Sequence, residues 1–226
     1  EGEIIIKLTK ERLVVANTGA PFTREGVISL MTPNASSKGL DDKKIGSKGL
    51  GFRSLLNWAD SIHVVSKELS IKFSREAANR FLERMFEKYP NVKNYLNKNS
   101  KSKSPIAVLV APEWEEIDFK QYERFATVIH VNFKGTEIYN DIKKKIESIG
   151  PGELIFLSKL KAIHTIIEDK KRTLKKIHGQ EGKRPTVTIQ VSDEGGVQFE
   201  KKWTIFADSG DIEKSFLNED DPETYD

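Results

Sequence analysis

The sequence contains no cysteine and no long apolar run, and each absence narrows the classes of protein it can belong to. Without cysteine among its 226 residues the chain has no disulfide bonds and no thiolate chemistry, which agrees with a reducing compartment. No stretch approaches the roughly eighteen apolar residues of a membrane-spanning helix, and no signal-peptide pattern opens the sequence. We therefore expect a cytoplasmic protein with no membrane partner.

The chain also has little net charge and few histidines. The formal net charge of +3 is too small to indicate a dedicated nucleic-acid binder. Two basic clusters, residues 143–145 and 170–176, leave two interpretations open: a solvated surface or a contact for a polynucleotide backbone. The four histidines, at positions 63, 130, 164 and 178, lack the spacing of metal ligands, so we predict no metal site built by the protein alone.

What the sequence does contain is a glycine-rich segment, IGSKGLGFRS, at residues 45–54. Its glycines stand between a lysine-rich polar loop and an apolar run that predicts a helix over residues 52–59. Because glycine admits positive φ and close backbone approach, such a turn can direct several N–H groups at one phosphate. The segment is not a Walker A loop, since no Gly-Lys-Ser/Thr follows its last glycine, and it lacks the buried strand that precedes a dinucleotide fingerprint.

A second glycine motif lies upstream. Residues 13–16 predict a short apolar strand that runs into NTGAPFT at residues 17–23, where Thr23 is placed to cap a helix ending near Met31. A strand that ends in a polar side chain, a glycine and a helix cap provides a floor with one hydrogen-bonding group. Such a floor suits a planar base.

Hydrophobic periodicity and turn residues predict the remaining elements. Strands are expected at residues 3–8, 12–16 (which includes the apolar residues 13–16), 61–66, 69–73, 106–110, 125–133, 162–167, 186–191 and 197–206. Further helices are expected at residues 74–88, 135–149 and 153–160, with Pro90 ending the first of them.

NTGAPFT, Ser36-Ser37-Lys38 and IGSKGLGFRS together resemble the gyrase, heat-shock chaperone, histidine kinase and MutL (GHKL) ATP-binding superfamily, most closely its sacsin-like branch. The resemblance covers residues 3–167. It implies an α/β (α+β) two-layer sandwich of the Bergerat type, in which helices cover one face of a mixed, mainly antiparallel sheet. Residues 168–226 are then a basic connector, a β-hairpin and an acidic tail that begin a following domain.

The resemblance implies a role for each matching position. Asn17 matches the aspartate that accepts a hydrogen bond from the adenine amino group, and Gly19 lets the base lie against the backbone. Phe22 matches an apolar residue beside the base, and Thr127 matches a threonine that begins a late core strand near the base. Residues 32–48 match the ATP lid, and the positions implied in the lid and around the phosphates are Ser37, Lys38, Gly46, Ser47, Lys48, Gly49, Leu50, Gly51 and Phe52.

Two departures from the family pattern bear on activity. Asparagine at position 17 can donate as well as accept, so selectivity for adenine is expected to be looser than with a carboxylate. In the superfamily, a helix before the first hairpin carries a glutamate that activates water and an asparagine that holds magnesium, whereas this sequence opens on the hairpin of residues 3–15. No catalytic residue is therefore assigned, and we expect this chain alone to hydrolyse ATP poorly.

The sequence thus predicts a domain that binds ATP or ADP with Mg²⁺ and couples ordering of its lid to nucleotide state. In a full-length protein it would be a slow, chaperone-like or switch-type ATPase that reports to adjacent domains. The alternative is a catalytically inactive GHKL-like module that binds a protein client or a nucleic acid.

Overall fold

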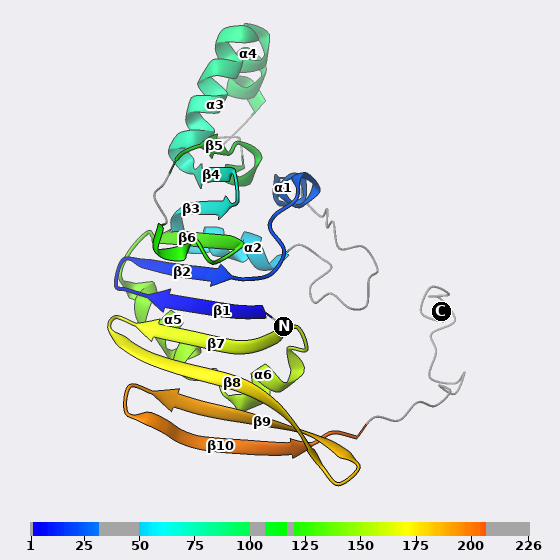
Figure 1. Cartoon of the computed structure of the whole chain (residues 1–226). Helices are drawn as coiled ribbons and strands as arrows, with labels where there is room; N and C mark the ends of the chain where they lie inside the picture. Colours follow the sequence, from blue (N-terminus) through cyan, green and yellow to red (C-terminus); the bar gives the residue numbers. More distant parts are fainter. Residues whose placement is uncertain (1, 32–49, 100–106, 117–119, 207–226) are drawn as a thin grey trace, which may run out of the picture.

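A computed structural model describes residues 2–31, 50–99, 107–116 and 120–206 of the chain (Figure 1). These residues form a mixed α/β fold around one open, ten-stranded sheet in the order β10-β9-β8-β7-β1-β2-β6-β3-β4-β5. Neighbouring strands are antiparallel except for β1 and β7, which are parallel. In the part of the chain described, no helix combines the length and apolar character needed to cross a membrane.

The elements have the following bounds. The strands are β1 (Gly2–Leu8), β2 (Arg12–Asn17), β3 (Ala59–Ser66), β4 (Leu69–Ser74), β5 (Glu113–Trp114), β6 (Thr127–Phe133), β7 (Leu160–Ile167), β8 (Lys170–Glu181), β9 (Arg184–Asp193) and β10 (Gly196–Thr204). The α-helices are α1 (Arg24–Met31), α2 (Leu50–Ser54), α3 (Arg75–Lys88), α4 (Pro90–Asn99), α5 (Glu137–Glu147) and α6 (Pro151–Phe156). Three 3-10 turns complete the described set: η1 (Leu55–Asn57), η2 (Val108–Val110) and η3 (Lys120–Tyr122).

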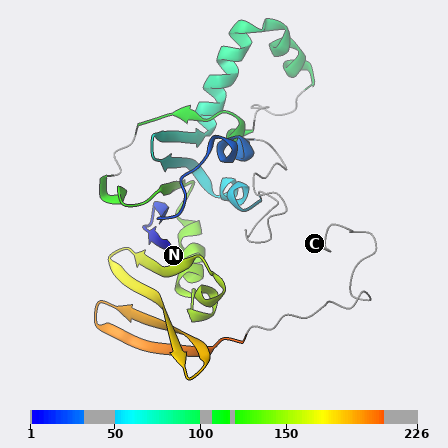
Figure 2. The ribbon, with the colours of Figure 1, turned by 45° about the vertical axis from the view of Figure 1, so that its right-hand side comes forward.

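Helices α1, α2, α5 and α6 lie on one side of the sheet (Figure 2). Alternate residues of each strand face them, because successive side chains of a strand point to opposite faces. Ile62 and Val64 of β3 belong to the core beneath α1 and α2, and Ile163 of β7 belongs to the core beneath α6. A smaller apolar cluster on the other face joins Val14 and Ala16 of β2 to Tyr122, Phe125 and Val128. The described chain is thus a helix-covered sheet with a second, partly covered face.

Helices α3 and α4 stand off beyond the β4 and β5 end of the sheet (Figure 1). The predicted helix 74–88 is confirmed, with Ser74 accepting a hydrogen bond from Ala77 N as its N-cap. Pro90 ends that helix as predicted but also begins α4, which the sequence reading missed, because proline at the first helical position loses no hydrogen bond. The strand expected at residues 106–110 is wrong: residues 108–110 form η2.

The strands that follow α6 extend the same sheet. The stretch interpreted as a basic connector is the twelve-residue strand β8, which pairs with β7 on one side and β9 on the other. The expected hairpin at residues 186–206 is present as β9 and β10. The domain boundary expected after residue 167 falls at the tight turn between β7 and β8.

Candidate functional site

The end of β2 and the start of β6, where the sequence places the base site, lie side by side and form one corner of the sheet. Asn17, the last residue of β2, is the register partner of Thr127, the first residue of β6. The backbone N–H of Ala126 donates to Asn17 O at 2.8 Å, which closes the end of this ladder. Directly opposed residues share a face of the sheet, so both side chains lie on the face that carries α1. The structure therefore brings together two predicted base-site residues that are far apart in sequence.

Ser66, at the end of β3, ties this corner together and was not singled out from the sequence. Its Oγ lies 3.0 Å from Thr127 Oγ1, accepts a hydrogen bond from Phe22 N at 2.8 Å and donates to Ala126 O at 2.8 Å. Ser66 and Thr127 are both buried, at 3% and 2% exposure. One hydroxyl thus connects the NTGAPFT loop, the end of β3 and the start of β6.

The number of protons and lone pairs on the Ser66 hydroxyl determines whether Thr127 can donate or accept a hydrogen bond with a further partner. A serine hydroxyl has one proton and two lone pairs. Because Ser66 donates its proton to Ala126 O, its contact with Thr127 requires Thr127 to be the donor. Phe22 N and Thr127 then occupy both lone pairs of Ser66. The Thr127 hydroxyl is left with acceptor capacity, and no proton, for a further partner.

The loop after β2 is shaped by its own side chains. Asn17 Oδ1 accepts a hydrogen bond from Gly19 N at 3.0 Å, the local turn that asparagine favours at strand ends. A Cβ atom on Gly19 would lie 3.1 Å from that same oxygen, tighter than ordinary van der Waals contact. Thr18 is tied to β1, since its Oγ1 accepts from Glu3 N at 2.8 Å. Asn17 Oδ1 keeps one lone pair beyond the turn.

Helix α1, which follows the first glycine motif, and helix α2, which lies within the second, are joined directly. Phe22 and Phe52 both pack against the core cluster that contains Phe73, and the Phe52 and Phe73 rings meet edge to face with centroids 6.1 Å apart. The Arg53 guanidinium of α2 donates to Leu30 O at the end of α1 at 3.1 Å. Arg53, interpreted from the sequence as an ordinary residue of a first helical turn, thus holds the end of one helix against the other.

The described residues include only part of the predicted phosphate site. Leu50 and Gly51 lie in α2, which is shorter than the predicted helix 52–59 and continues into η1. The other predicted positions in the lid and around the phosphates fall outside the described residues: Ser37, Lys38, Gly46, Ser47, Lys48 and Gly49.

The basic clusters have structural partners. Arg172 Nη1 donates to Glu147 O and Ile149 O at 3.2 and 2.9 Å, at the C-terminal end of α5, and buried Lys176 donates to Leu157 O at 3.0 Å after α6. A cation near the C-terminal end of a helix also interacts favourably with the helix dipole. These two cations of the cluster at residues 170–176 therefore serve packing of the helices rather than presenting free charge.

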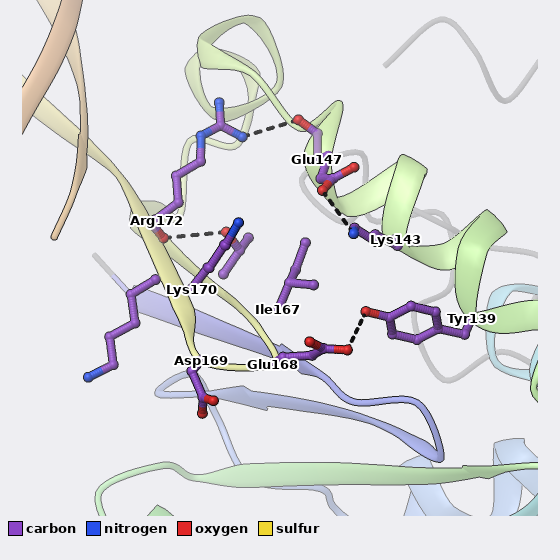
Figure 3. A pocket seen from close by; sticks show the side chains of 10 residues that line it. Tyr139, Lys143, Glu147, Ile167, Glu168, Asp169, Lys170 and Arg172 are labelled. Atoms are coloured by element: carbon purple, nitrogen blue, oxygen red, sulfur yellow. Dashed lines mark hydrogen bonds and ion pairs between the residues drawn. The ribbon is translucent and has the colours of Figure 1, made fainter. Parts of the chain in front are cut away.

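A cavity of about 490 Å³ lies between α5 and the turn from β7 to β8 (Figure 3). Tyr139 donates to Glu168 at 3.1 Å and Lys143 lies 3.9 Å from the Glu147 carboxylate, so its wall is built from internal polar pairs. Neither Asn17, Phe22 nor Thr127 lines it. This cavity is separate from the corner at the end of β2.

The face of the sheet opposite the helices, here called the open face, carries three of the four histidines: His63, His130 and His164. His63 Nε2 lies 3.0 Å from the Glu115 carboxylate, and this hydrogen bond is the largest cause that lowers the pKa of Glu115. Burial, with smaller contributions from His63 and Arg12, lowers the pKa of His130 to about 4. Burial also lowers the pKa of His164. Within the described ranges no three histidine or acidic side chains gather to hold a metal ion.

No protein-family model matches the chain, and no curated protein matches it either. The features that bear on function are therefore the two glycine motifs and the hydrogen-bonded groups at the end of β2. Sequence reasoning missed Ser66 because a serine before a turn is unremarkable. The signal that could have found it is its alternation with Ile62 and Val64, which places it on the helix-covered face.

Proposed function

We propose that this chain is an adenine-nucleotide-binding domain of the GHKL type with a Bergerat-type fold. The observation that supports it best is the hydrogen-bonded set formed by Ser66 with Phe22 N, Ala126 O and Thr127. This set joins the loop of the first glycine motif to the start of β6, where the family resemblance expects the base. A network of this kind fixes the acceptor groups before a ligand arrives, which reduces the ordering cost of binding.

The proposed base site recognises adenine through acceptors. The 6-amino group of adenine is a donor, and both the Thr127 hydroxyl and the second lone pair of Asn17 Oδ1 accept. Guanine carries a carbonyl oxygen at the equivalent ring position, which meets those acceptors unfavourably. The Asn17 amide group can turn its donor to that oxygen, so discrimination against guanine is moderate. Phe22 supplies apolar surface for the ring face.

The proposed phosphate site uses the backbone of Gly46, Gly49 and Gly51 together with the lid over residues 32–48. Ordering a loop costs about 1–2 kcal/mol per residue in backbone entropy, which phosphate contacts must offset. Nucleotide state then biases the order of the lid and so the surface seen by adjacent domains. Mg²⁺, when bound with the nucleotide, would neutralise part of the phosphate charge. We assign it no ligand among the described side chains.

The experiment compares two glycine substitutions in thermal-shift and calorimetric titrations with ADP and ATP. Gly49→Val places a branched Cβ in the proposed phosphate turn and should weaken binding at least tenfold. Gly152→Val is the matched control, because a Cβ on Gly152 meets no atom within 4 Å and the residue lies on α6, away from the site.

The wild-type chain and the Gly152→Val variant should bind alike. Equal ADP affinity in all three proteins would contradict the phosphate assignment. A folded wild-type chain that binds no nucleotide at millimolar concentration would contradict the proposed function itself, and would favour a GHKL-like module that serves protein or nucleic-acid contact.

A further inference from the structure

Strand β10 leaves one edge of the sheet open. It pairs with β9 on one side, ends the strand order on the other, and is exposed at every residue but Trp203 (Figure 1). The opposite edge of the sheet, β5, is only two residues long and lies beside the α3 and α4 arm. A long open edge strand presents a row of unpaired N–H and C=O groups that can template another strand. The nine residues of β10 therefore need an explanation that β5 does not.

The direction of the outward backbone groups follows from one hydrogen bond. Ile205 N donates to Pro185 O at 2.9 Å, which continues the register that pairs Trp203 with Val187 and Lys201 with Ile189. In an antiparallel pair, residues alternate between bonding to the neighbour and pointing away from it. Odd-numbered residues from 199 to 205 thus bond to β9, and Glu200, Lys202 and Thr204 direct their N–H and C=O groups outward.

We infer that the partner of this edge is a second copy of the chain, joined antiparallel across a twofold axis that passes through Lys201. In this register Glu200 lies opposite Lys202 of the second copy, and Phe199 lies opposite its Trp203. The outward groups of Glu200 and Lys202 then meet each other as hydrogen-bonded pairs, as the alternation requires. Opposite-charge and aromatic cross-strand pairs both stabilise a contact of this kind.

Charge selects this register over its neighbours. A slip of two residues in one direction places Glu200 opposite Glu200, and a slip in the other places Lys202 opposite Lys202. Like charges directly opposite each other are unfavourable. The inferred register also sets Lys201 opposite its own copy, but of the three registers it alone adds two opposite-charge pairs between Glu200 and Lys202. The Lys201 ammonium itself lies over the Trp203 ring of its own chain, 5.3 Å from the ring centre.

The contacts that these side chains already make are compatible with the second copy. Glu200 accepts a hydrogen bond from Gln190 at 2.7 Å, and Lys202 lies 2.9 Å from Glu181. A carboxylate and an ammonium each have capacity for a further partner. Phe199 is half exposed and Val197 is 54% exposed, so a facing strand removes apolar area from water. Because the contact is mainly one pair of strands, the dimer forms in a concentration-dependent equilibrium.

The absence of cysteine makes the register directly testable. In the inferred dimer, Lys201 and its copy form a non-hydrogen-bonded pair with Cα atoms about 4.5 Å apart, within the span of a disulfide. Mild oxidation of the Lys201→Cys protein should therefore give a covalent dimer. Val197→Cys is the control on the same strand, because its two copies would lie about 26 Å apart.

Charge reversal gives a second, independent readout by sedimentation equilibrium. Glu200→Lys and Lys202→Glu should each raise the dimer dissociation constant at least fivefold, and the double variant should recover most of that loss, because the pair re-forms with its signs exchanged. Circular dichroism checks that each protein is folded. The inference is wrong if the wild-type chain stays monomeric at all concentrations, if both cysteine variants cross-link equally, or if the double variant dimerises no better than the singles.

Discussion

Replacing Ser66 by alanine removes the hydroxyl that joins three segments at the proposed base site. In the wild-type chain that hydroxyl satisfies Phe22 N–H and Ala126 C=O and takes the proton of Thr127. The substitution leaves the fold of β3 unchanged, because alanine has no steric demand that serine lacks. Any loss of stability in Ser66→Ala therefore measures the hydrogen bonds made by the Ser66 hydroxyl.

The expected cost follows from the groups left without partners. A buried polar group that loses its hydrogen bond costs about 1–3 kcal/mol. Two backbone groups lose their partner here, and both Phe22 and Ala126 are half-buried, so some water reaches them. We expect the free energy of unfolding to fall by about 2–3 kcal/mol. The freed Thr127 proton can also turn to Ala126 O or into the site, so the acceptor for adenine is no longer fixed.

Urea unfolding followed by circular dichroism measures the first effect, and ADP titration measures the second. Ser61→Ala is the matched control on the same strand. Its side chain points to the open face and accepts one hydrogen bond from Asn132 Nδ2 at 2.9 Å, so we expect a loss of about 0.5–1.5 kcal/mol and unchanged ADP affinity.

Thr127→Val separates the two effects, because it removes the acceptor while Ser66 keeps its bonds to Phe22 and Ala126. It should weaken ADP binding about 5- to 30-fold, equivalent to about 1–2 kcal/mol, with a smaller loss of stability than Ser66→Ala. The structural role of Ser66 is refuted if Ser66→Ala and Ser61→Ala lose the same free energy of unfolding. The role of Thr127 as the base acceptor is refuted if Thr127→Val binds ADP as tightly as the wild-type chain does.

Three further predictions concern other residues. Asn17→Ala should lower the preference for adenine over guanine nucleotides by about 1–2 kcal/mol, whereas Asn17→Asp keeps the acceptor; unchanged ATP and GTP affinities in Asn17→Ala would show that the side chain faces elsewhere. The pKa of His130 is about 4 in the folded chain, below its ordinary 6.5, so the unfolded chain binds the proton more readily and stability falls as pH drops from 6.5 towards 4. His130→Gln should lose less stability between pH 7.5 and 4.5 than the wild-type chain, by up to about 3 kcal/mol in urea unfolding; an equal loss would contradict the assignment. Arg172→Met should cost about 1–2 kcal/mol in the same assay because two carbonyls at the end of α5 lose their donor, whereas exposed Lys170→Met should cost little.

Much of the sheet could be predicted from the sequence, because apolar and polar residues alternate along its strands and polar residues occupy the turns of its hairpins. The hairpin of β3 and β4 is an example, with Ile62, Val64, Ile71 and Phe73 all in one core. The pairing of Asn17 with Thr127 was expected from the family resemblance alone, because alternation marks Thr127 only as an ordinary strand residue.

The missed elements have physical reasons that composition does not reveal. Strand β8 has the charge of a loop, yet Arg172 and Lys176 on its helix-covered face find carbonyl acceptors at the ends of α5 and α6. Those acceptors come from tertiary packing, which a local pattern cannot contain. The hydrogen bonds of Ser66 also come from tertiary packing, since two of its partners lie 44 and 61 residues away in sequence, although alternation alone could have placed its side chain on the helix-covered face.

Binding of adenine nucleotides at the end of β2 can be observed residue by residue, by titrating isotope-labelled chain with ADP and following the amide NMR shifts. We expect saturable shifts at Gly19, Phe22 and Thr127, with GDP causing smaller changes and Thr127→Val weakening the response. Adenine binding at the end of β2 is ruled out if a folded sample shows no shifts at millimolar ADP, or if the shifts occur instead around Tyr139 and Arg172 at the cavity beside α5.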